Sequence, residues 1–245
     1  MWRWMAISEA LLLSACGLLY PSDKLRHRIT VNVDTPAGIR EGSSVIETRV
    51  EEGKSWGDAS GTRFRLKGEA VAVDLPGGRT LYALLRPADS GLGDASGYQT
   101  RLLWEALRGR GSSSAGGNTS AMDVMEARAA AKEAKVKLEL PAHLYPLLVT
   151  FRDPADPASI TRVEPSQLAA HFGAGVRLRG MAVEVTDAAV TEGLESRLPD
   201  RFWRRWAATH KAQMSLNGGI MRNPFFQSLA GNLSRNDFRE GEKGP

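Results

Sequence analysis

The chain has 245 residues, of which 42% are hydrophobic and 24% are charged, and its formal net charge is +4 with a pI near 9.4. This balance excludes a disordered or membrane-spanning chain, and the length allows one large domain or two small ones. The mild positive charge fits attraction to an anionic membrane surface and does not by itself indicate nucleic-acid binding.

The first sixteen residues have the pattern of an export signal. Arg3 supplies a positive start, an apolar stretch runs from Met5 to Leu13, and Leu13-Ser14-Ala15-Cys16 follows. An apolar residue, two small residues and a cysteine match the lipobox of bacterial lipoproteins, in which the thiol is acylated and the peptide is cut before it. The stretch is too short to cross about 30 Å of hydrocarbon, so it is not a transmembrane helix.

Cys16 is the only cysteine of the chain. Disulfides within the chain and cysteine-rich zinc sites are therefore excluded, and an exported free thiol would be open to oxidation unless it is acylated. Glu9 departs from the pattern, because a carboxylate inside the apolar stretch costs a few kcal/mol of insertion free energy at the centre of a helix. The alternative is a cytoplasmic protein whose amino-terminal helix ends in a cysteine by chance.

The sequence divides into five predicted regions. Residues 1–15 are the signal peptide, 16–26 the lipidated cysteine and its tether, 27–90 a strand-rich region, 91–215 a mixed region, and 216–245 a loosely ordered tail. Alternation of apolar and polar residues, with turn signals between, predicts strands in the third region. They are expected at 28–34, 43–50, 62–66, 69–75 and 80–85.

The mixed region alternates helical and strand patterns. Helices are predicted at 98–107, 121–135, 164–172 and 199–213, and strands at 135–140, 145–152 and 176–186. The Gly/Ser-rich stretch at 109–120 is predicted to be a flexible loop. The fold class is therefore α+β, with an antiparallel-sheet-rich amino-terminal half, as in a small sandwich, followed by mixed helices and strands.

The sequence contains no catalytic or metal-binding pattern that stands out. The four histidines, His27, His143, His171 and His210, lack the spacing of a metal site, and no GxSxG elbow or phosphate loop is present. Asp153 and Asp156 bracket a Pro-rich turn that favours capping over calcium binding. We therefore predict no catalytic residues, no metal and no cofactor, although a triad assembled from distant residues stays open.

One segment suggests a contact surface. Arg201, Trp203, Arg204, Arg205 and Trp206 lie on the predicted helix 199–213. Such a helix can lie at a membrane interface or on a protein partner, with arginines at headgroups and tryptophans at the acyl boundary. The alternative is that the aromatic side chains, with Phe202, dock on the sheet while the arginines face water.

Three segments carry a resemblance to known proteins. The Leu-Ser-Ala-Cys-Gly-Leu-Leu-Tyr-Pro start, the strand around 28–38 with Gly-Ser-Ser-Val-Ile-Glu, and Leu-Val-Thr-Phe-Arg-Asp-Pro-Ala-Asp-Pro resemble an uncharacterised group of proteobacterial lipoproteins. The resemblance implies export and anchoring, and Gly17 after the cysteine, in place of Asp, implies the outer membrane. It implies no activity.

The expectation that follows is a non-enzymatic, lipid-anchored periplasmic domain on the inner side of the outer membrane. Its partners would be the bilayer, through acylated Cys16, and an envelope protein, with no nucleic acid. The alternative from another class is an anchored hydrolase whose catalytic residues are dispersed in the sequence.

Overall fold

A computed structural model describes residues 22–54, 60–89, 94–108, 121–216 and 223–241. Cys16, the predicted signal peptide and the Gly/Ser-rich stretch at 109–120 lie outside the described residues. The strands are β1 (Ser22–Thr35), β2 (Gly38–Lys54), β3 (Ser60–Glu69), β4 (Val71–Leu75), β5 (Arg79–Pro87), β6 (Lys137–Glu139), β7 (Pro146–Phe151), β8 (Ile160–Arg162), β9 (Arg177–Val185) and β10 (Arg239–Glu240). The helices are α1 (Ala95–Arg108), α2 (Ala121–Glu133), α3 (Leu168–Phe172), α4 (Asp200–Leu216), α5 (Pro224–Gln227), α6 (Leu229–Asn232) and α7 (Arg235–Phe238).

The strands form two antiparallel sheets. The larger sheet has six strands in the order β10-β3-β2-β1-β9-β6, and the smaller has four in the order β4-β5-β7-β8. All the pairings are antiparallel. The predicted α+β class, with a sheet-rich amino-terminal half followed by helices, is confirmed.

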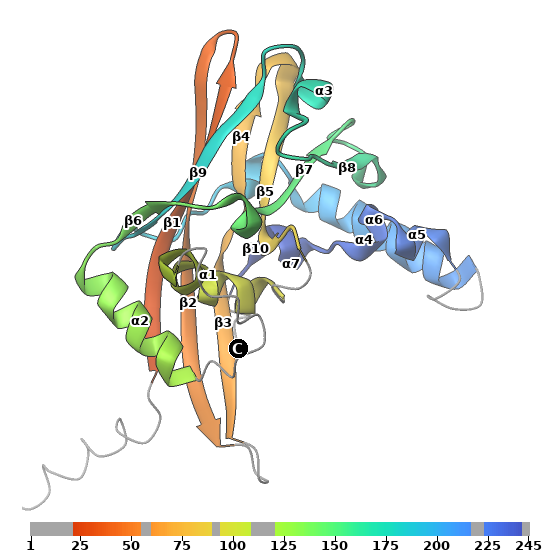
Figure 1. The fold of residues 1–245 in the computed structure, drawn as a ribbon. Helices are drawn as coiled ribbons and strands as arrows, with labels where there is room; N and C mark the ends of the chain where they lie inside the picture. The colour runs from red at the N-terminus through yellow and green to blue at the C-terminus, as the bar shows by residue number, and fades with distance from the viewer. Residues whose placement is uncertain (1–21, 55–59, 90–93, 109–120, 217–222, 242–245) are drawn as a thin grey trace, which may run out of the picture.

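The β1–β2 hairpin forms the long axis of the larger sheet (Figure 1). Along β1, Leu25, His27, Ile29, Val31 and Val33 are buried on one face, while the residues that alternate with them are partly exposed. This is the period-two burial that a sheet with one solvated face produces. Gly42 marks where the two sheets meet, because a Cβ there would lie 2.3 Å from the carbonyl oxygen of Ala72 in β4.

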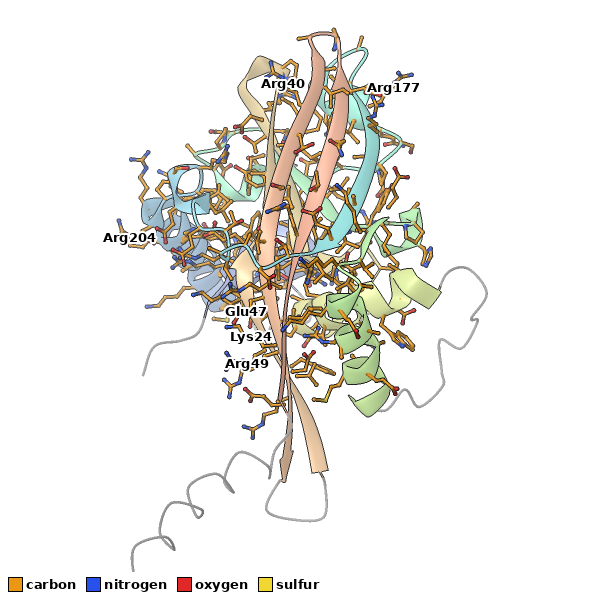
Figure 2. The ribbon with its side chains drawn as sticks, turned by 90° about the vertical axis from the view of Figure 1, so that its left-hand side faces the viewer. Lys24, Arg40, Glu47, Arg49, Arg177 and Arg204 are labelled. Atoms are coloured by element: carbon orange, nitrogen blue, oxygen red, sulfur yellow. The ribbon has the colours of Figure 1, made fainter. Side chains whose placement is uncertain are left out.

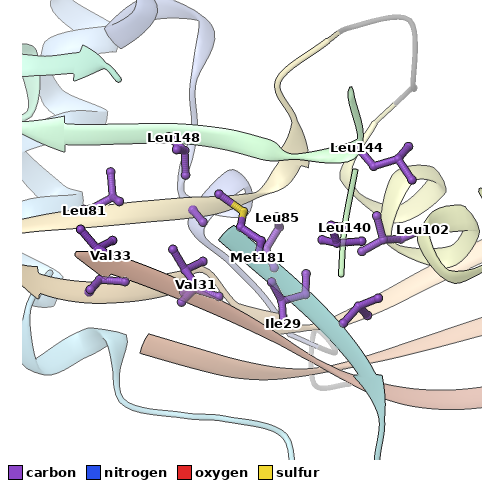
Figure 3. Packing of buried hydrophobic residues seen from close by; sticks show 14 of the residues in the cluster. Ile29, Val31, Val33, Leu81, Leu85, Leu102, Leu140, Leu144, Leu148 and Met181 are labelled. Atoms are coloured by element: carbon purple, nitrogen blue, oxygen red, sulfur yellow. The ribbon is translucent and has the colours of Figure 1, made fainter. Parts of the chain in front are cut away.

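The first core lies between the two sheets. Ile29, Val31 and Val33 of β1 face Leu81 and Leu85 of β5, and Leu148 of β7 and Met181 of β9 complete the packing (Figure 3). Helix α1 closes this core with Tyr98, Leu102 and Leu103. The apolar area removed from water here is the main source of stability for the sheet-rich half.

The smaller sheet is buried on both faces. Successive residues of β5 alternate between cores, because Leu81, Ala83 and Leu85 join the first while Tyr82 and Leu84 join a second. The second core is completed by β7, α4 and the carboxy-terminal helices. The described part of the molecule therefore has three layers, which are the six-stranded sheet, the four-stranded sheet and the α4–α7 layer (Figure 1).

Two predicted regions contain regular structure that the sequence did not reveal. Strand β1 begins at Ser22, inside the region predicted to be tether. Within the tail predicted to be loosely ordered, residues 223–241 form three short helices and β10, with Leu233 and Phe238 buried. Its few apolar residues dock on the second core, and Asn223 and Ser228 cap the successive helical turns.

Candidate functional site

Helix α4 carries the five residues predicted to contact a membrane or a partner. Its aromatic side chains face inward, since Phe202, Trp203 and Trp206 are 4%, 7% and 4% exposed. The ring centroids of Phe202 and Phe151 lie 5.2 Å apart, and Trp203 stacks on Trp206 at 5.7 Å. The aromatics thus dock on the smaller sheet, as in the second of the two arrangements that the sequence allows.

The arginines of α4 face the other way. Arg201, Arg204 and Arg205 are exposed, and Arg204 points away from the body of the molecule (Figure 2). A membrane contact through the indole rings would require them to leave the second core. Contact through the arginines needs no such change, and it remains a prediction.

A groove of about 460 Å³ runs along α4 on the side of α6 and α7. Its lining includes Asp200, Trp203, Arg204, His210, Ser234 and Arg235. The guanidinium of Arg235 lies 5.9 Å from the centroid of the Trp203 ring, which is within range of a cation–π contact. The groove has the size of a small-molecule or side-chain site and carries charge of both signs at its rim.

Asp200, His210 and Ser234 bring the residue types of a hydrolytic triad to this groove, but each has another partner. The Oγ of Ser234 donates to Asp237 Oδ2 at 3.1 Å in a helix-capping arrangement, and Asp200 lies 3.4 Å from Arg235. The Trp206 indole donates to Nε2 of His210 at 2.7 Å. No hydrogen bond between the three is present among the described residues, so the groove does not have the geometry of a nucleophile activated by a base.

A second hollow of about 330 Å³ lies on the other side of α4. It is lined by Arg197, Arg201 and Arg205 together with Phe202 and the turn at Pro154 and Ala155. Arg197 is held by two hydrogen bonds to Asp74, at 2.6 and 3.2 Å, and these lower the pKa of that carboxyl below its ordinary value despite partial burial. Three guanidinium groups around one hollow suit an anionic group of a ligand or partner.

A buried polar cluster joins α1 and α2 to the larger sheet. Arg128 of α2 is 1% exposed, and it binds the Asp23 carboxylate, Thr48 Oγ1 at 2.9 Å, Thr48 O at 3.1 Å and Thr100 O at 3.2 Å. Burial lowers the pKa of Arg128, and the charge of Asp23 offsets part of this effect. A buried guanidinium with four acceptors is a structural clamp, and removal of its carboxylate would leave an uncompensated charge.

His27 lies next to this clamp and is fully buried. Its Nε2 lies 3.0 Å from Gln99 Oε1, while Gln99 Nε2 donates to the carbonyl of Leu85 at 2.8 Å. The amide orientation therefore makes Nε2 the protonated nitrogen and leaves Nδ1 as an acceptor without a partner. Burial lowers the pKa of His27 to about 4; the hydrogen bond that Nε2 donates to Gln99 opposes this effect, and the charge of nearby Arg128 adds to it.

The two aspartates that bracket the Pro-rich turn have structural roles. Asp153 Oδ1 accepts from the amide of Ala155 at 2.8 Å, and Asp156 Oδ1 accepts from that of Ala158 at 2.9 Å, so both cap their turn. In the part of the chain that the structure describes, no three His, Cys, Asp or Glu side chains are grouped to hold a metal ion. Nor is any helix among those residues long and apolar enough to cross a bilayer.

Sequence reasoning missed the Arg128 cluster and the charge on the sheet. Asp23 lies in the stretch expected to be tether, and no local pattern connects it to an arginine 105 residues away. The positive charge on the solvated face of the sheet could have been predicted from the sequence, since Lys24, Arg26 and Arg28 recur at period two. Comparison with known proteins found no matching family model, curated protein or solved structure.

Proposed function

We propose that the protein is a lipoprotein of the bacterial cell envelope, cut before Cys16 and held by acyl chains on that residue. The folded part acts as a binding or envelope-associated domain on the periplasmic side of the outer membrane. The observation that carries the proposal is the Leu13-Ser14-Ala15-Cys16 motif, in which the only cysteine of the chain ends a short apolar stretch. Strand β1 begins six residues later, at Ser22, so the tether is short.

Binding is favoured over catalysis by the two hollows that flank α4. One combines an apolar floor of tryptophans with a charged rim, and the other is lined by three arginines. The alternative, an anchored hydrolase, needs a nucleophile, a base and an orienting carboxylate that converge. In the described residues Ser234, His210 and Asp200 share a groove without converging, and the proposal therefore rests on binding.

Metabolic labelling with a fatty acid tests the anchor. The wild-type chain should incorporate the label and fractionate with the outer membrane, because two or more acyl chains give stable attachment. Cys16→Ala removes the acylated thiol and should abolish both the label and the membrane fraction. Gly17→Asp is the matched control, which should keep the label and move the protein to the inner membrane. A wild-type chain without label, equally soluble with Ala at 16, would overturn the proposal.

A further inference from the structure

The solvated face of the larger sheet carries a dense group of cations at the end where β1 begins. Antiparallel register places Lys24 of β1 opposite Arg49 of β2, and Arg49 opposite Arg65 of β3. The neighbouring rows add Arg26 and Lys67 on one side and Arg63 on the other. Residues directly opposite one another point to the same side of the sheet, so these six side chains share one surface, which we call the basic face.

The basic face is not balanced by its own carboxylates. Glu47 lies 3.0 Å from Lys24 and 2.8 Å from Arg26, and Glu51 lies 2.9 Å from Arg65. Burial alone would raise the pKa of Glu47, but these two hydrogen-bonded cations lower it below its ordinary value. Glu192 lies at the border of this face, 3.9 Å from Lys67. Six cations against these three carboxylates leave a surplus of +3 on this face.

The ion pairs of the basic face do not remove its surplus of positive charge. Like charges directly opposite one another on adjacent strands are destabilising, and Lys24, Arg49 and Arg65 form a row of three. Glu47 and Glu51 lie diagonal to this row, 3.8 and 3.9 Å from Arg49, and offset part of the repulsion. The three cationic side chains remain 48%, 34% and 55% exposed. A row of solvent-accessible cations in excess of its carboxylates suits a polyanionic surface outside the protein.

The position of the basic face near the predicted anchor indicates that the polyanionic surface is a membrane. Cys16 is six residues before Ser22, so an extended chain between them spans at most about 20 Å. Lys24 lies about 7 Å further along β1, whereas Val33, opposite Arg40, lies about 37 Å from the start of the strand. Figure 2 shows Lys24, Glu47 and Arg49 near this end and Arg40 and Arg177 at the opposite end of the molecule. Acyl chains on Cys16 would therefore hold the basic face close to the bilayer.

We propose that the basic face docks on anionic phospholipid headgroups of the membrane in which Cys16 is anchored. This inference rests on the proposed function and adds a second, electrostatic membrane signal to the acyl chains. Docking fixes the orientation of the domain, because the end of the sheet that carries Arg40 and Arg177 then points away from the bilayer. The cations lie within reach of the surface potential, which falls off over about 8 Å at physiological salt.

Vesicle binding tests the docking without the acyl chains. The full chain with Cys16→Ala is sedimented with vesicles of phosphatidylglycerol mixed with phosphatidylcholine and with vesicles of phosphatidylcholine alone. Binding to the anionic vesicles should be tighter and should weaken as salt is added. The triple variant Lys24→Gln/Arg49→Gln/Arg65→Gln should bind them about 100-fold more weakly, at about fivefold per residue.

The matched control is Arg40→Gln/Arg177→Gln/Arg179→Gln, which removes the same charge at the opposite end of the sheet and should retain wild-type affinity. Circular dichroism and thermal unfolding verify that both variants fold. Equal affinity of the two triple variants, or equal binding to both kinds of vesicle, would overturn the docking. So would a DNA duplex that displaces the vesicles at physiological salt. Loss of fatty-acid label in cells, with vesicle binding intact, would overturn the anchor alone.

Discussion

At the residue scale, His27 shows how burial makes a titratable group a determinant of stability. The ring is fully buried beside the Arg128 guanidinium, and its Nε2–H donates to Gln99 Oε1. Among the described residues, no acceptor faces Nδ1 to bind the N–H that a second proton would create. Burial therefore lowers the pKa of His27 from 6.5 to about 4. Between these values the unfolded chain binds a proton that the folded chain does not, so the free energy of unfolding falls as the pH falls.

The pH dependence of unfolding should change when His27 is replaced. Between pH 6.5 and 4 the wild type should lose up to about 1.4 kcal/mol of unfolding free energy per pH unit through this residue. His27→Gln, which does not titrate, should show a smaller slope, although it is less stable at neutral pH. His143→Gln, at an exposed position, serves as the control and should keep the wild-type slope. Urea unfolding at several pH values measures this, and an unchanged slope in His27→Gln would contradict the prediction.

At the element scale, α4 separates core packing from surface contact. Trp206 lies between Phe151, Phe202 and Phe238, with ring centroids 5.6 to 6.3 Å away, and is 4% exposed. Trp206→Ala should lower the free energy of unfolding by about 3–5 kcal/mol, because it leaves a cavity in the second core. Arg204→Ala, two residues earlier and on the exposed side of the helix, should change the free energy of unfolding by no more than about 0.5 kcal/mol.

Urea unfolding of the two variants measures this difference. If α4 instead presents its indole rings to a membrane or partner, Trp206→Ala should leave stability near wild type and weaken vesicle binding. That outcome would favour the alternative in which the tryptophans of α4 contact a membrane or a partner. A variant with both changes controls for coupling, since side chains on opposite sides of a helix should contribute additively.

The same helix shows what the sequence could and could not predict. Period-two alternation located β1 to β5 and β9, and helical spacing located α1 and α4. The aromatic stripe of α4 could not reveal its partner, because a stripe that docks on a sheet and one that enters a membrane interface have the same spacing. Strands of two or three residues, such as β10 and β8, are too short to show a period. Arg128 and Asp23 meet only through the tertiary fold.

At the scale of the whole molecule, the two cores share the central strands of the smaller sheet. Leu81 and Leu85 of β5 pack in the first core and Tyr82 and Leu84 in the second, and β7 divides in the same way between Leu148 and Val149. If either core loses its packing, the face of these strands that lined it becomes exposed, and the strands that support the other core are weakened. The described layers should therefore unfold as one cooperative unit.

Phe238, near the carboxy-terminal end of the described chain, tests this coupling. Its ring is fully buried against Tyr82, Phe151 and Trp203, and its carbonyl accepts from the amide of Ala70 between β3 and β4. Phe238→Ala should lower the free energy of global unfolding by about 3–5 kcal/mol. Hydrogen exchange should then lose protection by the same factor at β1, in the first core, and at α4, in the second. Loss confined to α4–α7 would show that the helical layer opens alone and that the shared strands do not couple the cores.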